Sequence, residues 1–164
     1  MGKLADQSIL EKARDYFEKG YRLQMSGHIK EAIQLYKMSL EVCPTPEAHT
    51  FLGWAYSHEG KYDLAIQECK RAIELDPEYG NPYNDIGAYL IHQGHFEEAE
   101  YWLRQAVEAP KYEARHFAHF NLGWVMERMG RWFDAIEEYK KAQEHDPQYT
   151  LATIAQLDLQ ARLN

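Results

Sequence analysis

A ten-residue phrase recurs four times along the chain, and this repetition limits the possible fold more than any other feature. Each copy has a glycine at its third position and a second glycine seven residues later, as in FLGWAYSHEG (51–60) and NLGWVMERMG (121–130). The first glycines fall at positions 20, 53, 87 and 123, and an alanine stands twelve residues after each one. Steps of 33 to 36 residues are typical of arrays of helix–turn–helix units, so the chain is expected to be one continuous stack of helix pairs.

The second repeat shows how one such unit is built. Thr45 can cap a helix whose first residue is Pro46, where the missing N–H costs nothing. This helix is expected to end near Glu59, because Gly60 can take the left-handed conformation that ends helices. A second helix is expected from about residue 62 until just before Asp76-Pro77. Two helices joined by so short a turn must pack antiparallel.

A glycine inside each first helix costs up to about 1 kcal/mol relative to alanine, so a steric need must repeat with it. We expect Gly53 to face Ala65 on the second helix and to let the two helix axes approach closely.

These positions resemble the tetratricopeptide repeat, whose pattern is W-x2-L-G-x2-Y, then A-x3-F, then P. The second repeat matches the pattern at these positions: His49, Leu52, Gly53, Tyr56, Ala65, Cys69 and Pro77. The resemblance implies an all-α fold, a right-handed superhelical α-solenoid of about nine helices. It implies a single domain over 1–164, with repeats at about 13–45, 46–79, 80–112 and 116–149 and a capping helix at about 150–164.

Both flanks carry helix signals. Ser8-Ile9-Leu10-Glu11 can form a capping box, so the first helix is expected to begin a turn or more before the first repeat. Residues 150–164 resemble the solvating helix that closes such stacks, and they carry four apolar residues at helical spacing: Leu151, Ile154, Leu157 and Ala161.

One stripe of each first helix lies away from the packing face. In the family this stripe lines a concave groove where peptides dock, so the resemblance implies a peptide-binding site at Arg14, Phe17, Tyr21, Thr50, Trp54, Asn81, Asn84, Phe117, Phe120 and Trp124. Six of these residues are aromatic, and buried aromatics often dominate protein interfaces. The alternative is that curvature or the closing helix buries some of the rings as core.

Four further aromatics have other expected roles. Tyr62, Phe96 and Trp132 occupy one equivalent place and are expected to pack between repeats. Trp102 is expected to be exposed together with Phe133, and the two could form a self-association surface.

The charged clamp that some family members use to grip a terminal carboxylate is missing. Its places in repeats one to three hold Phe17, Tyr21, Phe51, Asn81 and Asp85, which supply no cation. An apolar or aromatic segment with polar flanks is the better expected ligand.

Composition excludes several function classes. The formal net charge of −8 argues against nucleic acid and anionic membranes as partners. No apolar run approaches the roughly 20 residues that span a bilayer. The N-terminus lacks a secretory h-region, and Cys43 and Cys69 fall inside helical patterns, which favours a cytoplasmic protein with reduced thiols.

No catalytic motif is evident, so we expect no enzyme and no cofactor. The pairs His92/His95 and His116/His119 have metal-like spacing but straddle helix ends, and no metal site is expected. The leading hypothesis is an adaptor or scaffold that binds a peptide or helix segment of another protein. The alternatives are a small chaperone for exported or aggregation-prone clients, and a self-assembling structural protein, at most a weak homo-oligomer.

Overall fold

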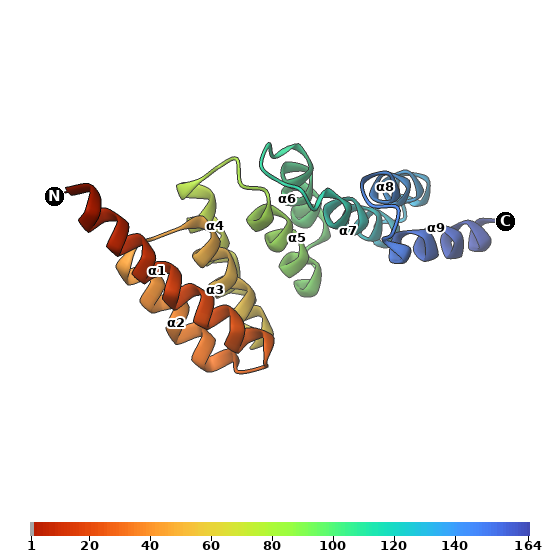
Figure 1. The fold of residues 1–164 in the computed structure, drawn as a ribbon. Helices are drawn as coiled ribbons and strands as arrows, with labels where there is room; N and C mark the ends of the chain where they lie inside the picture. The colour runs from red at the N-terminus through yellow and green to blue at the C-terminus, as the bar shows by residue number, and fades with distance from the viewer. Residues whose placement is uncertain (1) are drawn as a thin grey trace. The chain divides into compact units, whose positions relative to one another are not determined.

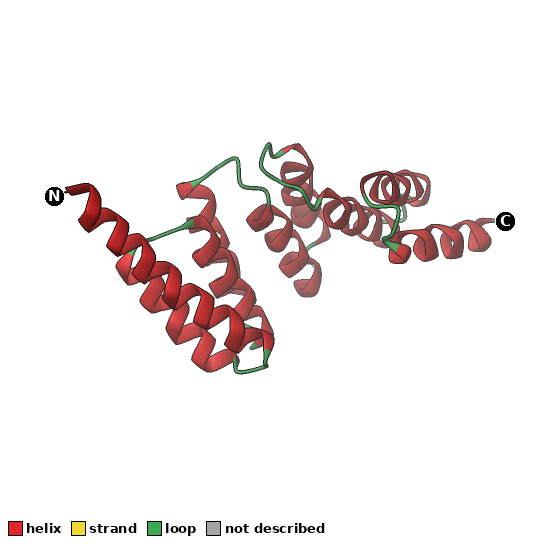
Figure 2. Ribbon diagram, viewed as in Figure 1, coloured by secondary structure: helices red, strands yellow, loops and turns green. Residues whose placement is uncertain are grey.

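The described part of the chain is entirely helical. The computed structural model describes residues 2–164, and the surroundings of side chains from residue 7 onward. Within these residues the only β-type contact is a single parallel bridge between Tyr79 and Lys111. Between residues 2 and 164, nine helices follow one another with short connections (Figures 1 and 2): α1 Gly2–Met25, α2 Ile29–Val42, α3 Pro46–His58, α4 Tyr62–Leu75, α5 Asn81–Gln93, α6 Phe96–Glu108, α7 Arg115–Arg128, α8 Trp132–His145 and α9 Thr150–Leu163. The expected all-α class is confirmed for these residues.

The helices form two compact units, Met1–Pro77 with α1 to α4 and Glu78–Asn164 with α5 to α9. Each unit is described by itself. In both units, the two helices of a repeat pack as an antiparallel pair. The first helix of a repeat also packs on the second helix of the repeat before it, as α3 does on α2 and α7 on α6. The expectation of a single domain over 1–164 stays a prediction.

The ends of α3 confirm the local reading of the sequence. The side chain of Thr45 accepts a hydrogen bond of 3.1 Å from the amide of Ala48, and Pro46 is the first helical residue. Gly60 has a φ of +72°, a left-handed conformation that a residue with a Cβ adopts only with strain. The turn that this glycine allows places α4 directly against α3.

Close helix approach explains the first glycine of each repeat. A Cβ on Gly53 would lie 2.9 Å from the carbonyl oxygen of Ala65, so the predicted contact is confirmed. In the fourth repeat a Cβ on Gly123 would lie 2.5 Å from the ring of Tyr139. Glycine is therefore required where two helix backbones, or a helix and a buried ring, touch.

The longer connection between α6 and α7 is held by one arginine. The guanidinium of Arg115 donates to the carbonyl oxygens of Val107 at 3.1 Å and Ala109 at 2.6 Å, and also to that of Tyr112. These carbonyls belong to the end of α6 and to the loop after it, where no further helical amide can reach them. Arg115 thus supplies the donors that the end of the helix lacks.

The flank predictions differ in outcome. Helix α1 begins at Gly2, more than a turn before the first repeat, as expected, but it runs without interruption through Ser8, so no capping box begins it there. Helix α9 covers Thr150–Leu163, where apolar spacing predicted a helix. It packs on α8 through Ala152 and Leu159, while Leu151, Ile154 and Leu157 are each more than half exposed and face away from α8.

Candidate functional site

In the N-terminal unit, three of the predicted site residues meet around a fourth ring. The ring of Phe51 lies 5.2 Å from Phe17, 5.7 Å from Tyr21 and 5.7 Å from Trp54 between centroids, in edge-on geometry. Such edge-to-face pairs are favourable because the positive ring edge meets the negative face. We call Phe17, Tyr21, Phe51 and Trp54 the α1–α3 aromatic surface.

This surface is anchored on the core and remains partly open. Phe17 and Phe51 pack against the buried cluster around Tyr36 and Leu52, so part of their area is core, as the alternative reading held. Trp54 is half-buried and its ring contacts that of His58 at a tilt of 45°, while Tyr21 is 42% exposed. A surface whose rings are fixed from beneath and open above loses little entropy when a ligand covers it.

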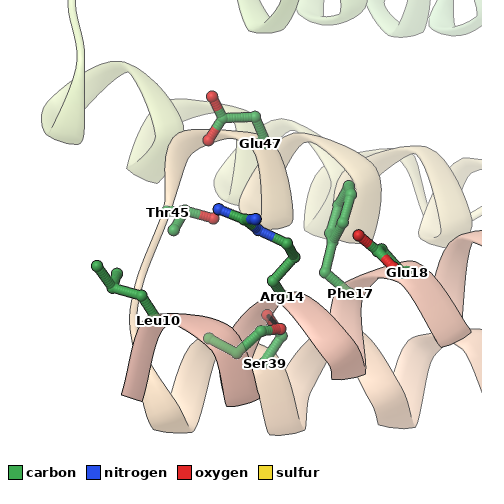
Figure 3. A pocket seen from close by; sticks show the side chains of 8 residues that line it. Leu10, Arg14, Phe17, Glu18, Ser39, Thr45 and Glu47 are labelled. Atoms are coloured by element: carbon green, nitrogen blue, oxygen red, sulfur yellow. Dashed lines mark hydrogen bonds between the residues drawn. The ribbon is translucent and has the colours of Figure 1, made fainter. Parts of the chain in front are cut away.

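A pocket of about 440 Å³ adjoins the aromatic surface at the start of α3. Figure 3 shows Arg14 reaching across it from α1 toward Thr45 and Glu47, with Leu10 at one end and Phe17 at the other. Ala13 and Ser39 also line it, and the hydroxyl of Ser39 donates to the carbonyl of Ala13 at 2.8 Å. The floor of the pocket is therefore made of apolar groups and of polar groups that already have a hydrogen-bond partner.

Charged groups lie at the rim of this pocket. Arg14 and Glu47 are exposed, and neither makes an ion pair in the described part of the chain. Glu18, also exposed, adds a second carboxylate. The pocket thus has apolar walls between charges of both signs.

Thr50 does not belong to the site. Its side chain is 4% exposed, and its hydroxyl donates to the carbonyl oxygen of Pro46 at 2.7 Å. A β-branched hydroxyl four residues after a carbonyl commonly makes this bond inside a helix. The helical phase placed Thr50 on the right stripe, but the local hydrogen bond turns it into the backbone.

In the C-terminal unit, two predicted rings meet at the start of α9. Phe117 and Phe120 on α7 each lie 5.4 Å from the ring of Tyr149, nearly perpendicular to it. Phe117 is 44% exposed, whereas Phe120 is half-buried and also contacts Tyr139 at 5.7 Å. This cluster is partly packing, and Phe117 is its exposed member.

Trp124 lies apart from that pair. Its ring contacts Phe96 at 5.9 Å, and the guanidinium of Arg128 stands over it at 4.6 Å, a cation–π contact. Asn81 and Asn84 are half-buried on α5, and Asn84 accepts a hydrogen bond of 3.1 Å from Asn121. These residues form separate small clusters within the unit.

Asp85, beside Asn84 on α5, is electrostatically unusual. Burial raises the pKa of its carboxyl group to about 7, although a hydrogen bond with Asn84 opposes that shift. A carboxyl group without a cation nearby resists ionisation when it is poorly solvated. Asp85 is therefore partly protonated near neutral pH.

A histidine contacts a glutamate at the same place in repeats two and four. Nδ1 of His49 lies 2.6 Å from Glu68, and Nδ1 of His119 lies 2.7 Å from Glu138. Burial alone would raise the pKa of Glu138, but hydrogen bonds from His119 and Lys141 outweigh it and lower the pKa. These histidines occupy the place of the pattern's tryptophan and connect the two helices of a pair.

Two residues were missed by sequence reasoning. Phe51 stands three residues before Trp54, so helical spacing alone could have placed it on the same side. Tyr149 lies in the turn before α9, where no periodic pattern applies.

The structure agrees with some of the remaining predictions for aromatic residues and differs from others. Phe133 is 76% exposed, as predicted. Trp132 was expected to pack between repeats but is 48% exposed, and Trp102 was expected to be exposed but is half-buried against Tyr83 and Tyr101.

Two further observations concern chemistry and membranes. Within the described residues, no three His, Cys, Asp or Glu side chains come together in a way that could hold a metal ion. None of the helices in residues 2–164 combines the length and apolarity that crossing a bilayer would require.

Three stretches of the chain match family models described as tetratricopeptide repeat, over residues 46–79, 68–101 and 116–149. Together these matches cover more than half of the chain.

Curated relatives are similar at a moderate level. The chain is 28% identical over 134 residues to the type IV pilus assembly protein PilF of Pseudomonas aeruginosa, covering 80% of this chain and 53% of that protein. It is 26% identical over 125 residues to protein bimA of Emericella nidulans, covering 73% of this chain and 15% of that one. It is 31% identical over 104 residues to the photosystem I assembly protein Ycf3 of Cuscuta gronovii, covering 57% and 62%. The chain thus spans less than two thirds of each of these relatives.

Solved structures are similar over most of the chain. The structure of Pseudomonas aeruginosa pilF matches with a TM-score of 0.86 at 26% identity, covering 93% of this chain and 70% of that one. A crystal structure of MamA protein matches with a TM-score of 0.73 at 26% identity, covering 89% and 79%.

Proposed function

The chain belongs to the tetratricopeptide repeat family, a family of protein–protein interaction modules, and from this premise we propose that it is an adaptor whose α1–α3 aromatic surface holds a segment of a partner protein. The matched family models describe repeats and no catalytic family. The partner in this proposal is a protein, and the proposed location is the cytoplasm, the compartment that the sequence favours.

The observation that carries the proposal is the aromatic surface with an open pocket beside it. Tyr21 and Trp54 present ring area beyond what their contacts with Phe51 use, and the pocket of about 440 Å³ offers space for one further apolar side chain. Aromatic rings at the centre of an interface often contribute most of the binding free energy. An extended or helical segment with one apolar anchor fits this arrangement.

The charges at the pocket rim add orientation. Arg14 and Glu18 on α1 and Glu47 on α3 can contact ligand residues of opposite sign. Rim charges contribute more to specificity and association rate than to affinity. The expected segment therefore has an apolar or aromatic anchor with polar, charged flanks, as the sequence suggested.

The names of two relatives favour one form of this function. PilF is named for type IV pilus assembly and Ycf3 for photosystem I assembly. We propose accordingly that the adaptor acts in the assembly of a multiprotein complex, where it holds a subunit segment until that segment finds its place. This role overlaps with that of the small chaperone which the sequence left open.

The test uses peptides selected on the protein itself. A display library of random twelve-residue peptides is selected on the wild-type chain, and the recovered peptides are measured by fluorescence anisotropy against variants. Trp54→Ala should weaken binding by about 2 kcal/mol or more, which is roughly thirtyfold. Trp132→Ala removes an equally large ring that is 48% exposed on another surface, and it should leave the affinity unchanged.

The opposite result would reject the site. If the selected peptides bind Trp54→Ala as tightly as wild type and lose affinity for Trp132→Ala, the proposed surface is wrong and the partner docks elsewhere. Circular dichroism of both variants checks that the helices remain intact.

A further inference from the structure

A second surface, at the far end of the C-terminal unit, combines a protruding ring with a pocket. The pocket has a volume of about 520 Å³ and lies between α8 and the last turn of α9. We call the residues that line it the C-terminal patch: Phe133, Ile136, Glu137, Lys140, Gln160, Leu163 and Asn164.

The α8 half of the patch is one helix face. Its four residues stand at spacings of three and four, so their side chains neighbour one another. Phe133 is the most exposed of the large hydrophobic side chains, at 76%, whereas Ile136 behind it is buried. A ring that points into solvent beside an apolar floor is unusual for a chain that binds nothing there.

The exposed stripe of α9 continues this surface. Leu157 stands one helical turn before Gln160, and Ile154 one turn before Leu157, so each neighbours the next along the helix. Both apolar residues are more than half exposed. The stripe that does not pack on α8 thus enlarges the patch along α9.

In the earlier repeats, the corresponding face of the first helix is covered by its own second helix. Counted from the preceding proline, Leu157 occupies the place of Gly87, where a Cβ would already lie 2.5 Å from Leu103. A leucine at that place cannot admit a helix at the same short distance. The surface requires a partner that approaches less closely.

The charges of the patch indicate which kind of partner it can bind. Glu137 and Lys140 lie side by side at the rim and pair at 2.7 Å, both well exposed. The chain as a whole carries −8, so two copies repel each other in general. At the patch the two rim charges cancel, and a two-fold axis would place each one opposite its counterion.

We propose that the C-terminal patch binds a second copy of this chain about a two-fold axis. Phe133 of each copy enters the pocket of the other, and Glu137 faces Lys140 of the partner subunit, and the reverse. Such isologous contacts need a self-complementary surface, which a knob and a pocket on one patch provide. This proposal is independent of the proposed function, because it uses no residue of the α1–α3 aromatic surface.

The available area suits a modest dimer. An aromatic side chain buries about 150–250 Å² when it is covered. Phe133 with Leu157 and Ile154 therefore supplies a substantial part of the roughly 800 Å² per subunit that standard interfaces bury. A monomer–dimer equilibrium is expected rather than an obligate dimer.

Sedimentation velocity over a dilution series tests the proposal on the 164-residue chain. Wild type should show a concentration-dependent dimer, and Phe133→Ser should shift the dissociation constant upward by about tenfold or more, as truncating a central anchor does. Phe117→Ser, which removes another exposed ring of the same unit, should leave the equilibrium unchanged. Circular dichroism confirms the fold of both variants.

A charge-swap series separates this dimer from unspecific association. Glu137→Lys and Lys140→Glu should each weaken the dimer, because like charges then face each other across the axis. Glu137→Lys also reduces the net negative charge of the chain, which would strengthen unspecific association. The specific dimer is expected to weaken instead, so the direction of the change distinguishes the two. The double variant Glu137→Lys/Lys140→Glu should restore the wild-type equilibrium.

Three results would overturn the proposal: a wild-type chain that stays monomeric at every concentration, a dimer that survives Phe133→Ser, or a double swap that fails to restore association. If Phe133→Ser does not fold, the charge swaps decide, because both residues are exposed. Peptide binding at the α1–α3 aromatic surface should be equal in Phe133→Ser and in the charge-swap variants, so failure here leaves the proposed function standing.

Discussion

Single residues set the distances between helices in this protein, and glycine is the clearest case. Gly123 has a buried neighbour, Tyr139, whose ring lies where a Cβ would have to stand. The hydroxyl of Tyr139 also donates to Glu127 at 3.0 Å, so the ring has little freedom to move. The repeated glycine is thus a packing requirement.

Gly123→Ala should lower the free energy of unfolding by about 1–3 kcal/mol, as overpacking of a core does. This loss should appear even though alanine favours the helix by up to about 1 kcal/mol. Urea denaturation followed by circular dichroism measures it, with Gln34→Ala on the exposed face of α2 as the control. An unchanged or raised midpoint for Gly123→Ala would show that the ring can move without cost.

Asp85 should make stability depend on pH in an unusual direction. Because its folded pKa is raised to about 7, the folded state prefers the neutral carboxyl group. The penalty for ionisation is absent below about pH 4, where the group is protonated in both states. It grows as the pH rises and is complete above about pH 7.

Asp85→Asn should therefore stabilise the protein at pH 8 by about 1–3 kcal/mol and should change it little near pH 4. Thermal unfolding at both values measures the difference. Asp15→Asn, at an exposed ion pair with Lys19, should stay within about 0.5 kcal/mol at both. A loss of stability for Asp85→Asn at pH 8 that disappears toward pH 4 would mean that the folded state stabilises the charged carboxylate.

At the scale of elements, the connection between α6 and α7 depends on Arg115. Its guanidinium binds three carbonyl groups from α6 and the loop, and hydrogen bonds to charged donors contribute about 1.5–3 kcal/mol each. Arg115→Ala should free the loop and speed trypsin cleavage after Lys111 at least about tenfold. A fall of roughly 1.4 kcal/mol in the free energy of local opening gives that factor.

The control for this prediction is Arg104→Ala. Arg104 pairs with Glu100 at an exposed site, and Glu100 keeps a second partner in Arg131. Mass spectrometry of the first cleavage products distinguishes the variants. Equal rates of cleavage after Lys111 in both would show that the loop is held by other contacts.

The elements also show where sequence reasoning succeeds and fails. Thr45, Pro46 and Gly60 predicted the ends of α3 because caps and left-handed turns are local properties. Ser8 did not begin a helix, since a capping residue is only a preference and helix-forming residues precede it. Apolar spacing predicted α9, but not which of its faces is covered, because periodicity gives the phase of a helix and the neighbouring helix decides which face is buried.

For the whole molecule, the sequence located most of the proposed site but not its limits. Phe17, Tyr21 and Trp54 were predicted and lie around one ring, yet the central ring, Phe51, was missed. Thr50 was wrongly included, because a side-chain hydrogen bond to the backbone cannot be seen in a helical wheel. Helical phase predicts a side of the helix, and contacts with neighbouring helices decide exposure.

The most direct test of the account uses the four tryptophans of the chain. Their indole N–H signals are resolved in a ¹⁵N–¹H correlation spectrum and assigned with Trp→Phe variants, and a library-selected peptide is titrated in. The account predicts that the signal of Trp54 shifts with saturation while that of Trp132 stays in place. A shift confined to Trp132, with Trp54 unmoved at saturation, would contradict the claim that α1 and α3 hold the partner.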